Sequence, residues 1–265
     1  MPTTTTRLRL QEWPDATNTG VPPGTSLTTH NGNMFINTAN QVIEDLHFVD
    51  GTIVLQGSAS NTLIRRCLID SGPSNFAGVL TESPFTASGT IIEDCEFDGG
   101  NVDGSTAIAS VNFTVRRCNI HNYENGFDVG AGGAANLDVR DCWLHDMVPY
   151  TVELDPHIDA VQGNPLASNV VFHHNNFDVG NDASSAFSIH TGVGGCSSNW
   201  WVTYNKLNGG AITMRCPTEN CSGSNIYINH NRFGRDFFFS VDDPATRGNV
   251  TEFIGNVYDD DNTPI

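Results

Sequence analysis

The sequence is poor in basic residues, in helical periodicity and in long apolar runs. Only 12 of its 265 residues are Lys or Arg, against 30 Asp or Glu, which gives a formal net charge of −18. Such a surface repels polyanions, so neither nucleic acid nor an anionic membrane is an expected partner. No segment keeps an apolar stripe at helical spacing. The lack of helical periodicity favours an all-β chain.

The chain also shows no transmembrane run and no signal peptide, since it begins Met1-Pro-Thr-Thr-Thr-Thr. A chain of this kind is either made in the cytoplasm, as phage structural proteins are, or is a secreted protein without its leader. We therefore expect an extracellular or phage-virion-associated location.

What the sequence does contain is one motif repeated eight times. Each copy centres on a Cys or Asn, with an apolar residue three positions before it and another two positions after it, as in Ile64-Arg-Arg-Cys67-Leu-Ile69. A weaker copy around Leu46 precedes them, and the steps between centres run from 21 to 33 residues, as in solenoid repeats. The eight centres are Cys67, Cys95, Cys118, Cys142, Asn175, Asn205, Asn231 and Asn256.

Each repeat has the composition of short strands and turns. Its apolar residues are β-branched or aromatic, and Gly, Asn, Asp and Ser fill the intervals. Two or three strands per repeat, coiled into one tube, predict a single all-β parallel β-helix of about nine turns. A second strand can be aligned in each repeat, and the predicted ends of these strands are Gln56, Thr81, Ser110, Gly130, Gln162, His190, Arg215 and Asp242.

The Cys/Asn positions are interpreted as one interior ladder. Stacked asparagines can hydrogen-bond from coil to coil, and cysteine is a small apolar filler. A zinc site is disfavoured because each thiol comes from a different coil. The remaining thiols, Cys196, Cys216 and Cys221, lie in neighbouring loops, and Cys221 is predicted to pair with either Cys196 or Cys216.

The first 40 residues are too rich in Pro and Gly for a regular element. We interpret residues 1–40 as an N-terminal cap over the exposed first coil and residues 41–265 as the β-helix domain.

The repeat resembles the right-handed parallel β-helix of the pectate-lyase-like superfamily over residues 40–260. Within it, His157-Ile-Asp159-Ala-Val-Gln162 resembles the His-x-Asp-Gly-Ile-Gln signature of many phage and bacterial β-helix proteins, and more distantly the Asn-Thr-Asp motif of polygalacturonases. Ser188-Ile-His190-Thr-Gly192 and Thr213-Met-Arg215 are similar to that family's Gly-His-Gly and Arg-x-Lys motifs. Cys216 stands near the expected lysine, and no adjacent pair of aspartates follows Asp159. Asn18–Thr25 resembles the entry segment of uncharacterised actinobacterial and phage β-helix proteins.

The resemblance implies a carbohydrate-active protein that binds and cleaves an extended, uronic-acid-containing polysaccharide, with elimination slightly favoured over hydrolysis. Elimination needs a base (His157 or His190), a group that neutralises the substrate carboxylate (Arg215) and an acid (Tyr150). Hydrolysis would instead use Asp159 with Asp128. Asp159 is alternatively a buried carboxylate in an inward column with Phe127, Phe187 and Ile212. Further substrate contacts are predicted at Gln162, Asp128, Asp242 and Trp143.

The predicted chemistry requires no cofactor, although acidic residues such as Asp155 are suited to calcium. A phage or surface protein that binds glycan without cutting it is the competing interpretation, because one scaffold serves many functions. The protein is expected to be a monomer or a homotrimer.

Overall fold

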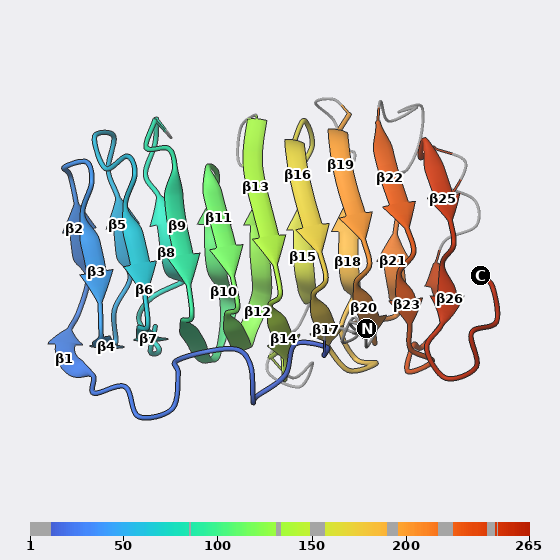
Figure 1. Ribbon diagram of the computed structural model, residues 1–265, viewed down its shortest axis with the longest axis horizontal. Coiled ribbons are helices and arrows are strands. Elements are labelled where there is room, and N and C mark those ends of the chain that lie inside the picture. The colour runs from blue at the N-terminus through green and yellow to red at the C-terminus, as the bar shows by residue number, and fades with distance from the viewer. Residues whose placement is uncertain are drawn as a thin grey trace, which may run out of the picture.

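A computed structural model describes most of the chain. The described residues are 12–84, 86–130, 134–148, 157–189, 196–216, 225–242, 247 and 249–265. In this part of the chain no helix is long and apolar enough to cross a membrane. The chain coils into a rod whose strands follow one another along its length, from the blue end to the red end (Figure 1).

The strands fall into three columns, which we name by their place relative to the Cys/Asn ladder. The pre-ladder column is a nine-stranded sheet. It comprises β3 (Val42–Glu44), β6 (Leu63–Arg65), β9 (Thr90–Glu93), β11 (Phe113–Arg116), β13 (Ala134–Arg140), β16 (Ser168–His173), β19 (Ser198–Thr203), β22 (Ile226–Asn229) and β25 (Glu252–Ile254). Its neighbouring strands all pair in parallel, because each repeat adds one strand that runs in the same direction.

The other two columns share a 17-stranded sheet, because two long strands run through both. The post-ladder column comprises β1 (Thr28–Asn31), β4 (Leu46–Val49), β7 (Leu68–Asp70), β10 (Glu96–Ser110), β12 (Asn119–Val129), β14 (Trp143–His145), β17 (Asn176–Asp178), β20 (Lys206–Asn208), β23 (Arg232–Phe233) and β26 (Val257–Tyr258). The distal column comprises β2 (Met34–Ile36), β5 (Ile53–Leu55), β8 (Ala77–Thr81), the second halves of β10 and β12, β15 (Asp159–Gly163), β18 (Ser185–Ile189), β21 (Ile212–Arg215) and β24 (Ser240–Asp242). The predicted all-β parallel solenoid is confirmed.

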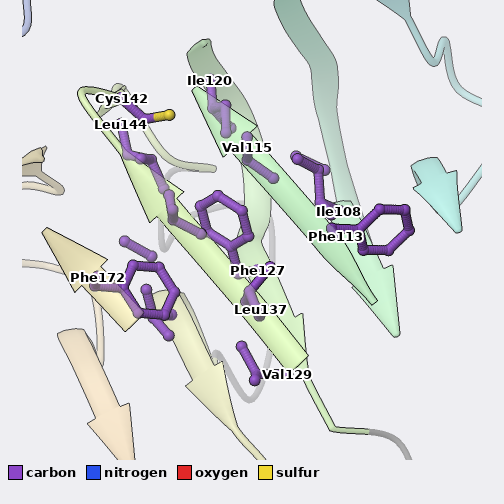
Figure 2. Close-up of a cluster of buried hydrophobic side chains, with 14 of the residues drawn as sticks. Ile108, Phe113, Val115, Ile120, Phe127, Val129, Leu137, Cys142, Leu144 and Phe172 are labelled. Carbon is purple, nitrogen blue, oxygen red and sulfur yellow. The ribbon is translucent and has the colours of Figure 1, made fainter. Parts of the chain in front are cut away.

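The core fills the tube from end to end. The two apolar positions of each repeat point inward, and only the last pair, Phe253 and Tyr258, is not fully buried. Figure 2 shows Phe127, Leu144 and Phe172 meeting inside the coil, where the Phe127 and Phe172 rings pack edge to face at 5.4 Å. Edge-to-face packing continues from Phe172 to Phe187 at 4.9 Å. Burial of these aromatic residues is the main stabilising contribution of the tube.

The predicted Cys/Asn ladder is confirmed. All eight side chains are buried, and the amide side chain of each ladder asparagine accepts the main-chain N–H of the residue one coil earlier. Each asparagine also donates to a main-chain carbonyl of the preceding coil, as Asn205 does to Phe172 over 3.0 Å. In the cysteine half the acceptor is a thiol, and Cys118 N lies 3.4 Å from Cys142 Sγ.

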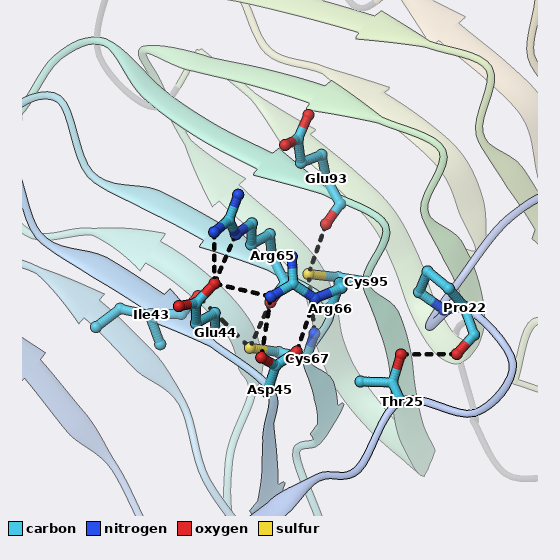
Figure 3. Close-up of polar contacts among 10 residues, drawn as sticks. All are labelled: Pro22, Thr25, Ile43, Glu44, Asp45, Arg65, Arg66, Cys67, Glu93 and Cys95. Carbon is cyan, nitrogen blue, oxygen red and sulfur yellow. Dashed lines mark hydrogen bonds and ion pairs between the residues drawn. The ribbon is translucent and has the colours of Figure 1, made fainter.

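A second regularity occupies the position directly before the ladder. Nine residues there have a left-handed backbone with φ between 51° and 67°, although only one is glycine. They are Asp45, Arg66, Asp94, Arg117, Asp141, His174, Tyr204, His230 and Gly255. Their side chains pair along the rod: Arg66 contacts Asp45 at 2.7 Å, and Arg117 contacts Asp94 at 2.6 Å. Figure 3 shows the first of these pairs, with Glu44 bridging Arg65 and Arg66.

The N-terminal segment lies along this same corner of the rod (Figure 1). Residues 28–31 and 34–36 already form β1 and β2, which pair with β4 and β5. Before them, the Trp13 ring stacks on His174 at 5.0 Å, and Pro14 O accepts a hydrogen bond from Asn176 Nδ2 over 2.9 Å. Gly20 N donates to Arg117 O, so residues 12–27 follow the outside of several coils.

Candidate functional site

The sequence-predicted site falls in the distal column. The register of β12, β15, β18 and β21 aligns Asp128 with Gln162, Gln162 with Ser188, and Ser188 with Arg215. Neighbouring members of such a row are about 4.8 Å apart. Each member follows an inward-facing core residue, so the row lies on the outer side of the sheet. We call Asp128, Gln162, Ser188 and Arg215 the distal row.

The predicted row of Gln162, His190, Arg215 and Asp242 is wrong in two of its four members. Ser188 stands beside Gln162 and Arg215, and Asp242 aligns with Met214 instead of Arg215. The sequence alignment matched the polar ends of the strands, whereas the structure aligns the inward residues Val161, Phe187 and Met214. For His190 the slip is two residues, which keeps every side chain on its face, so alternation alone does not reveal it. For Asp242 the slip is one residue, which turns its side chain to the inner face.

Asp242 has a structural role. It is buried and makes an ion pair with Arg247 at 2.6 Å. A buried carboxylate that faces inward and is already neutralised is not on the outer surface, where the distal row lies. The structure does not place Asp242 in the distal row, and the predicted substrate contact at Asp242 stays a prediction.

Asp159 lies at the inner edge of the same strands. It is 2% exposed, and its Oδ1 accepts a hydrogen bond from Ser185 Oγ. Its neighbours in register are Asn125 and Ser185, not Phe127 and Phe187 as predicted, and Asp128 aligns with Gln162 rather than with Ala160. The predicted burial of Asp159 is nevertheless confirmed.

Burial raises the pKa values of the Asp128 and Asp159 carboxyl groups. It raises the pKa of Asp159 to about 7, against the opposing hydrogen bond from Ser185 and the nearby charges of Arg215 and His157. Burial also raises the pKa of Asp128, and a hydrogen bond donated by Asn164 opposes this shift. Asp159 lies close enough to Arg215 to feel its charge, whereas Asp128 is three strands away at the other end of the row. Carboxyl groups with raised pKa values near an arginine are typical of functional sites.

Three buried polar atoms beside the distal row have no hydrogen-bond partner. They are Ser188 Oγ, Thr213 Oγ1 and Arg215 Nε, and the structure has no acceptor or donor for them within the part of the chain that it describes. Arg215 is held only by a long contact of 3.5 Å from Nη2 to Ser184 O. Leaving such groups unpaired costs free energy, which a bound ligand can recover. The sequence comparison included Ser188 and Thr213 in motif-like segments but predicted no role for them, because a single hydroxyl residue in a strand does not indicate a site by itself.

The other predicted site residues are dispersed. His157 is exposed and lies two residues before the start of β15. Trp143 lies in β14 of the post-ladder column, where its ring stacks on His145 at 3.5 Å. The structure therefore does not place Trp143 in the distal row. Tyr150, His190 and Asp155 lie outside the described residues.

The predictions for metal and disulfide are answered only in part. No group of three or more His, Cys, Asp or Glu side chains is arranged to hold a metal ion among the residues that the structure describes. The calcium site predicted near Asp155 stays a prediction. Cys196 is disulfide-bonded, Cys216 is a buried thiol, and Cys221 lies outside the described residues.

Comparison with protein families supports the fold. The model of the right-handed β-helix region family matches residues 25–154. Together with the parallel coil, this match defines the chain as a parallel β-helix protein. Neither the search of curated proteins nor the search of solved structures found a match. Since this scaffold is shared by carbohydrate-active enzymes and by other proteins, the fold does not assign a reaction.

Proposed function

We propose that the protein binds an extended polysaccharide across the distal row and cleaves it. The observation that carries this proposal is Arg215, which has an unpaired Nε and lies near the buried Asp159 carboxyl group, at one end of a row whose other end is Asp128; burial raises the pKa values of both carboxyl groups. A row of polar side chains on four successive strands is suited to a linear polymer, because successive sugar units can meet successive strands. Gln162 and Ser188 supply hydrogen-bonding groups between the two charged ends.

The chemistry that best uses these groups is elimination from a uronic acid unit. Arg215 would pair with the substrate carboxylate and so make the neighbouring C–H more acidic. His157 would take that proton, the electron pair would form the C=C bond, and the C–O bond to the leaving sugar would break. Asp159, at the inner edge, would act as a positioning residue whose charge orients Arg215 and His157. The acid that protonates the leaving oxygen is not assigned among these residues.

Hydrolysis is the second candidate, and it has its own supporting observation. Asp128 has a raised pKa and lies on the outer side, where it can serve as general acid. Asp159 has a raised pKa as well, and it would act as the base only if its side chain turned out of the inner edge where it is buried. This reaction would need no neutralising arginine. The two reactions therefore make opposite predictions for Arg215.

A screen against a polysaccharide panel tests the proposal. Products would be read in two ways, by the ultraviolet absorbance of unsaturated ends and by new reducing ends. Elimination yields both signals, whereas hydrolysis yields only reducing ends. Binding without either product would show that the protein recognises glycan without cutting it, and absence of both binding and products would refute the proposal.

Variants of the distal row then identify the chemistry. In elimination, Arg215→Ala should lower turnover by about 100-fold or more, because it removes charge stabilisation in the transition state. Arg140→Ala is the matched control, since Arg140 is an exposed arginine paired with Asp138 on the pre-ladder column. Wild-type turnover in Arg215→Ala, with loss in Asp128→Asn and Asp159→Asn, would replace elimination with hydrolysis. Full activity after exhaustive chelation would leave Arg215, and not calcium, as the neutralising group.

A further inference from the structure

The outer face of the post-ladder column carries two hollows that the distal row does not use. The first has a volume of about 360 Å³ and lies over β14 and β17. It is lined by Trp143, His145, Asp146, Met147, Asp178 and Asp182, among others. The second has a volume of about 310 Å³ and lies over β20 and β23, where Lys206, Asn208 and Arg235 contribute to its lining.

The two hollows are neighbours along the rod, because a hydrogen bond connects a lining residue of one to a lining residue of the other, and we call them together the groove. Asn208 Nδ2, from the second hollow, donates to Asp178 Oδ1, from the first, over 2.9 Å. The two residues are also partners in the register of β17 and β20. The groove therefore follows the rod across four successive strands, with about 4.8 Å per strand. This step is close to the length of one sugar ring in an extended chain.

The first hollow combines a flat apolar ring with hydrogen-bond acceptors. Trp143 is half-buried, and His145 packs against one face of its indole. Asp146, Asp178 and Asp182 supply carboxylate oxygens that accept hydrogen bonds from hydroxyl groups. A pyranose ring presents apolar C–H faces to an indole and hydroxyl groups around its edge, so this pair of features matches a sugar.

The negative charge of the first hollow favours neutral sugars over anionic ones. Among the described residues no Lys or Arg lines it, and burial lowers the pKa of His145 even though its Nδ1 lies 2.7 Å from Asp146 Oδ2. A neutral imidazole beside three carboxylates leaves the hollow negatively charged near neutral pH. A uronic acid polymer would be repelled there, whereas a neutral chain would not.

Asn176, in the middle strand of β14, β17 and β20, has a hydrogen-bond acceptor without a partner among the described residues. Asn176 lies between Trp143 and Lys206 in the register of β14, β17 and β20. Its Nδ2 is engaged by Pro14 O, but its Oδ1 is buried without a hydrogen-bond partner in the described structure. Asn176 lines neither hollow and is in contact with the N-terminal segment, so this atom is not counted among the groups that would contact a sugar.

We propose that this groove binds a neutral polysaccharide chain, as a site separate from the distal row, with Trp143 as its stacking residue. The site would hold the protein on a neutral glycan independently of any cleavage elsewhere. It does not depend on the proposed function, because its ligand is held by different residues.

The test uses three neutral probes, cellohexaose, maltohexaose and mannohexaose, with hexagalacturonate as the anionic comparison. Calorimetric titration of the full chain should detect binding of at least one neutral probe. Trp143→Ala should weaken that binding about tenfold, since an aromatic stacking contact is worth about 1 kcal/mol or more. Trp143→Phe should keep most of the affinity. Trp201→Ala is the matched control, because Trp201 is an exposed indole on the pre-ladder column.

Three results would overturn the proposal. They are no binding of any neutral probe at millimolar concentration, wild-type affinity in a folded Trp143→Ala variant, and loss of neutral-probe binding in Arg215→Ala. The last result would place the sugar in the distal row. Conversely, neutral-probe binding that survives Arg215→Ala, in a protein that cleaves nothing, would support the groove while removing the proposed function.

Discussion

Asn175 donates a hydrogen bond from its side-chain Nδ2 to Oδ1 of Asn205, one coil further along the rod, over 3.0 Å. The same Oδ1 accepts the main-chain N–H of Asn175 over 2.9 Å. One carbonyl oxygen thus satisfies two donors in an interior that water does not reach. Because the pattern repeats down the asparagine half of the ladder, each coil is tied to the next by side chains as well as by strand pairing.

Removing one asparagine from the ladder should be costly. Asn205→Ala would leave buried main-chain groups of Asn175 and Phe172 without partners, so we expect a loss of about 3 kcal/mol in the free energy of unfolding. Asn205→Cys should cost less, because a thiol occupies the same position in the first half of the ladder. Chemical denaturation of the three proteins measures the order. Equal stability of the alanine and cysteine variants would contradict this account of the ladder.

The cysteine half of the ladder should be chemically silent in the folded protein. Cys67, Cys95, Cys118 and Cys142 are fully buried thiols. A thiol reagent should therefore label them only after unfolding, which mass spectrometry of timed samples can show. Cys118→Asp should destabilise by several kcal/mol, on the order of the cost of an unpaired buried charge. Rapid labelling of all four thiols under native conditions would be incompatible with the structure.

The ladder was predictable because its signal is repeated and one-dimensional. Eight copies share one spacing of apolar residues, so errors in a single copy do not change the alignment. The residues before the ladder carry no comparable signal, since Asp, Arg, His and Tyr share only a backbone conformation. The left-handed conformation of these residues could therefore not be predicted from the sequence.

The distal row was predictable only in part. Alternation correctly placed Gln162 and Arg215 on one outer face, and a motif drew attention to Asp159. The choice between Ser188 and His190 depends on how two strands slide past each other by two residues, and the core contacts of Phe187 decide it. Of the residues that line the proposed groove on the post-ladder column, the sequence analysis predicted a substrate contact only at Trp143, because the lining comes from separate coils that share no motif.

Asp159 should make stability depend on pH. Its pKa is about 7 in the folded protein against an ordinary value of 3.8, so the folded state holds a proton that the unfolded state has released. The stability that this group contributes is therefore complete below about pH 4, declines as the pH rises to about 7, and is level above that. The decline should be on the order of 4 kcal/mol.

Asp159→Asn isolates this effect. The variant keeps an acceptor for Ser185 but does not titrate, so the difference in unfolding free energy between wild type and variant should change only between about pH 4 and pH 7. Urea denaturation at a series of pH values gives this difference directly. A difference that does not vary with pH would show that Asp159 is not buried as the structure has it.

The left-handed corner should tolerate asparagine and resist β-branched residues. Tyr204 has φ of 56° and is exposed, so its replacement tests conformation without opening the core. Tyr204→Val should be less stable than Tyr204→Asn by about 1–2 kcal/mol, because both lose the ring but only valine is strained at positive φ. Thermal unfolding of the two variants provides the comparison. Equal melting temperatures would mean that the corner relaxes out of this conformation.

The direction of the ladder bonds also bears on how the chain acquires its structure on the ribosome. The main-chain N–H of Cys142, Asn175, Asn205 and Asn231 is in each case accepted by a side chain that is synthesised later. During synthesis, the last coil of the rod therefore has a ladder main-chain N–H without its side-chain acceptor, because the next ladder residue has not yet been translated. Each new repeat supplies the hydrogen-bond acceptor for the repeat before it. The coil synthesised last is therefore the least stable part of the rod until Asn256 has been translated.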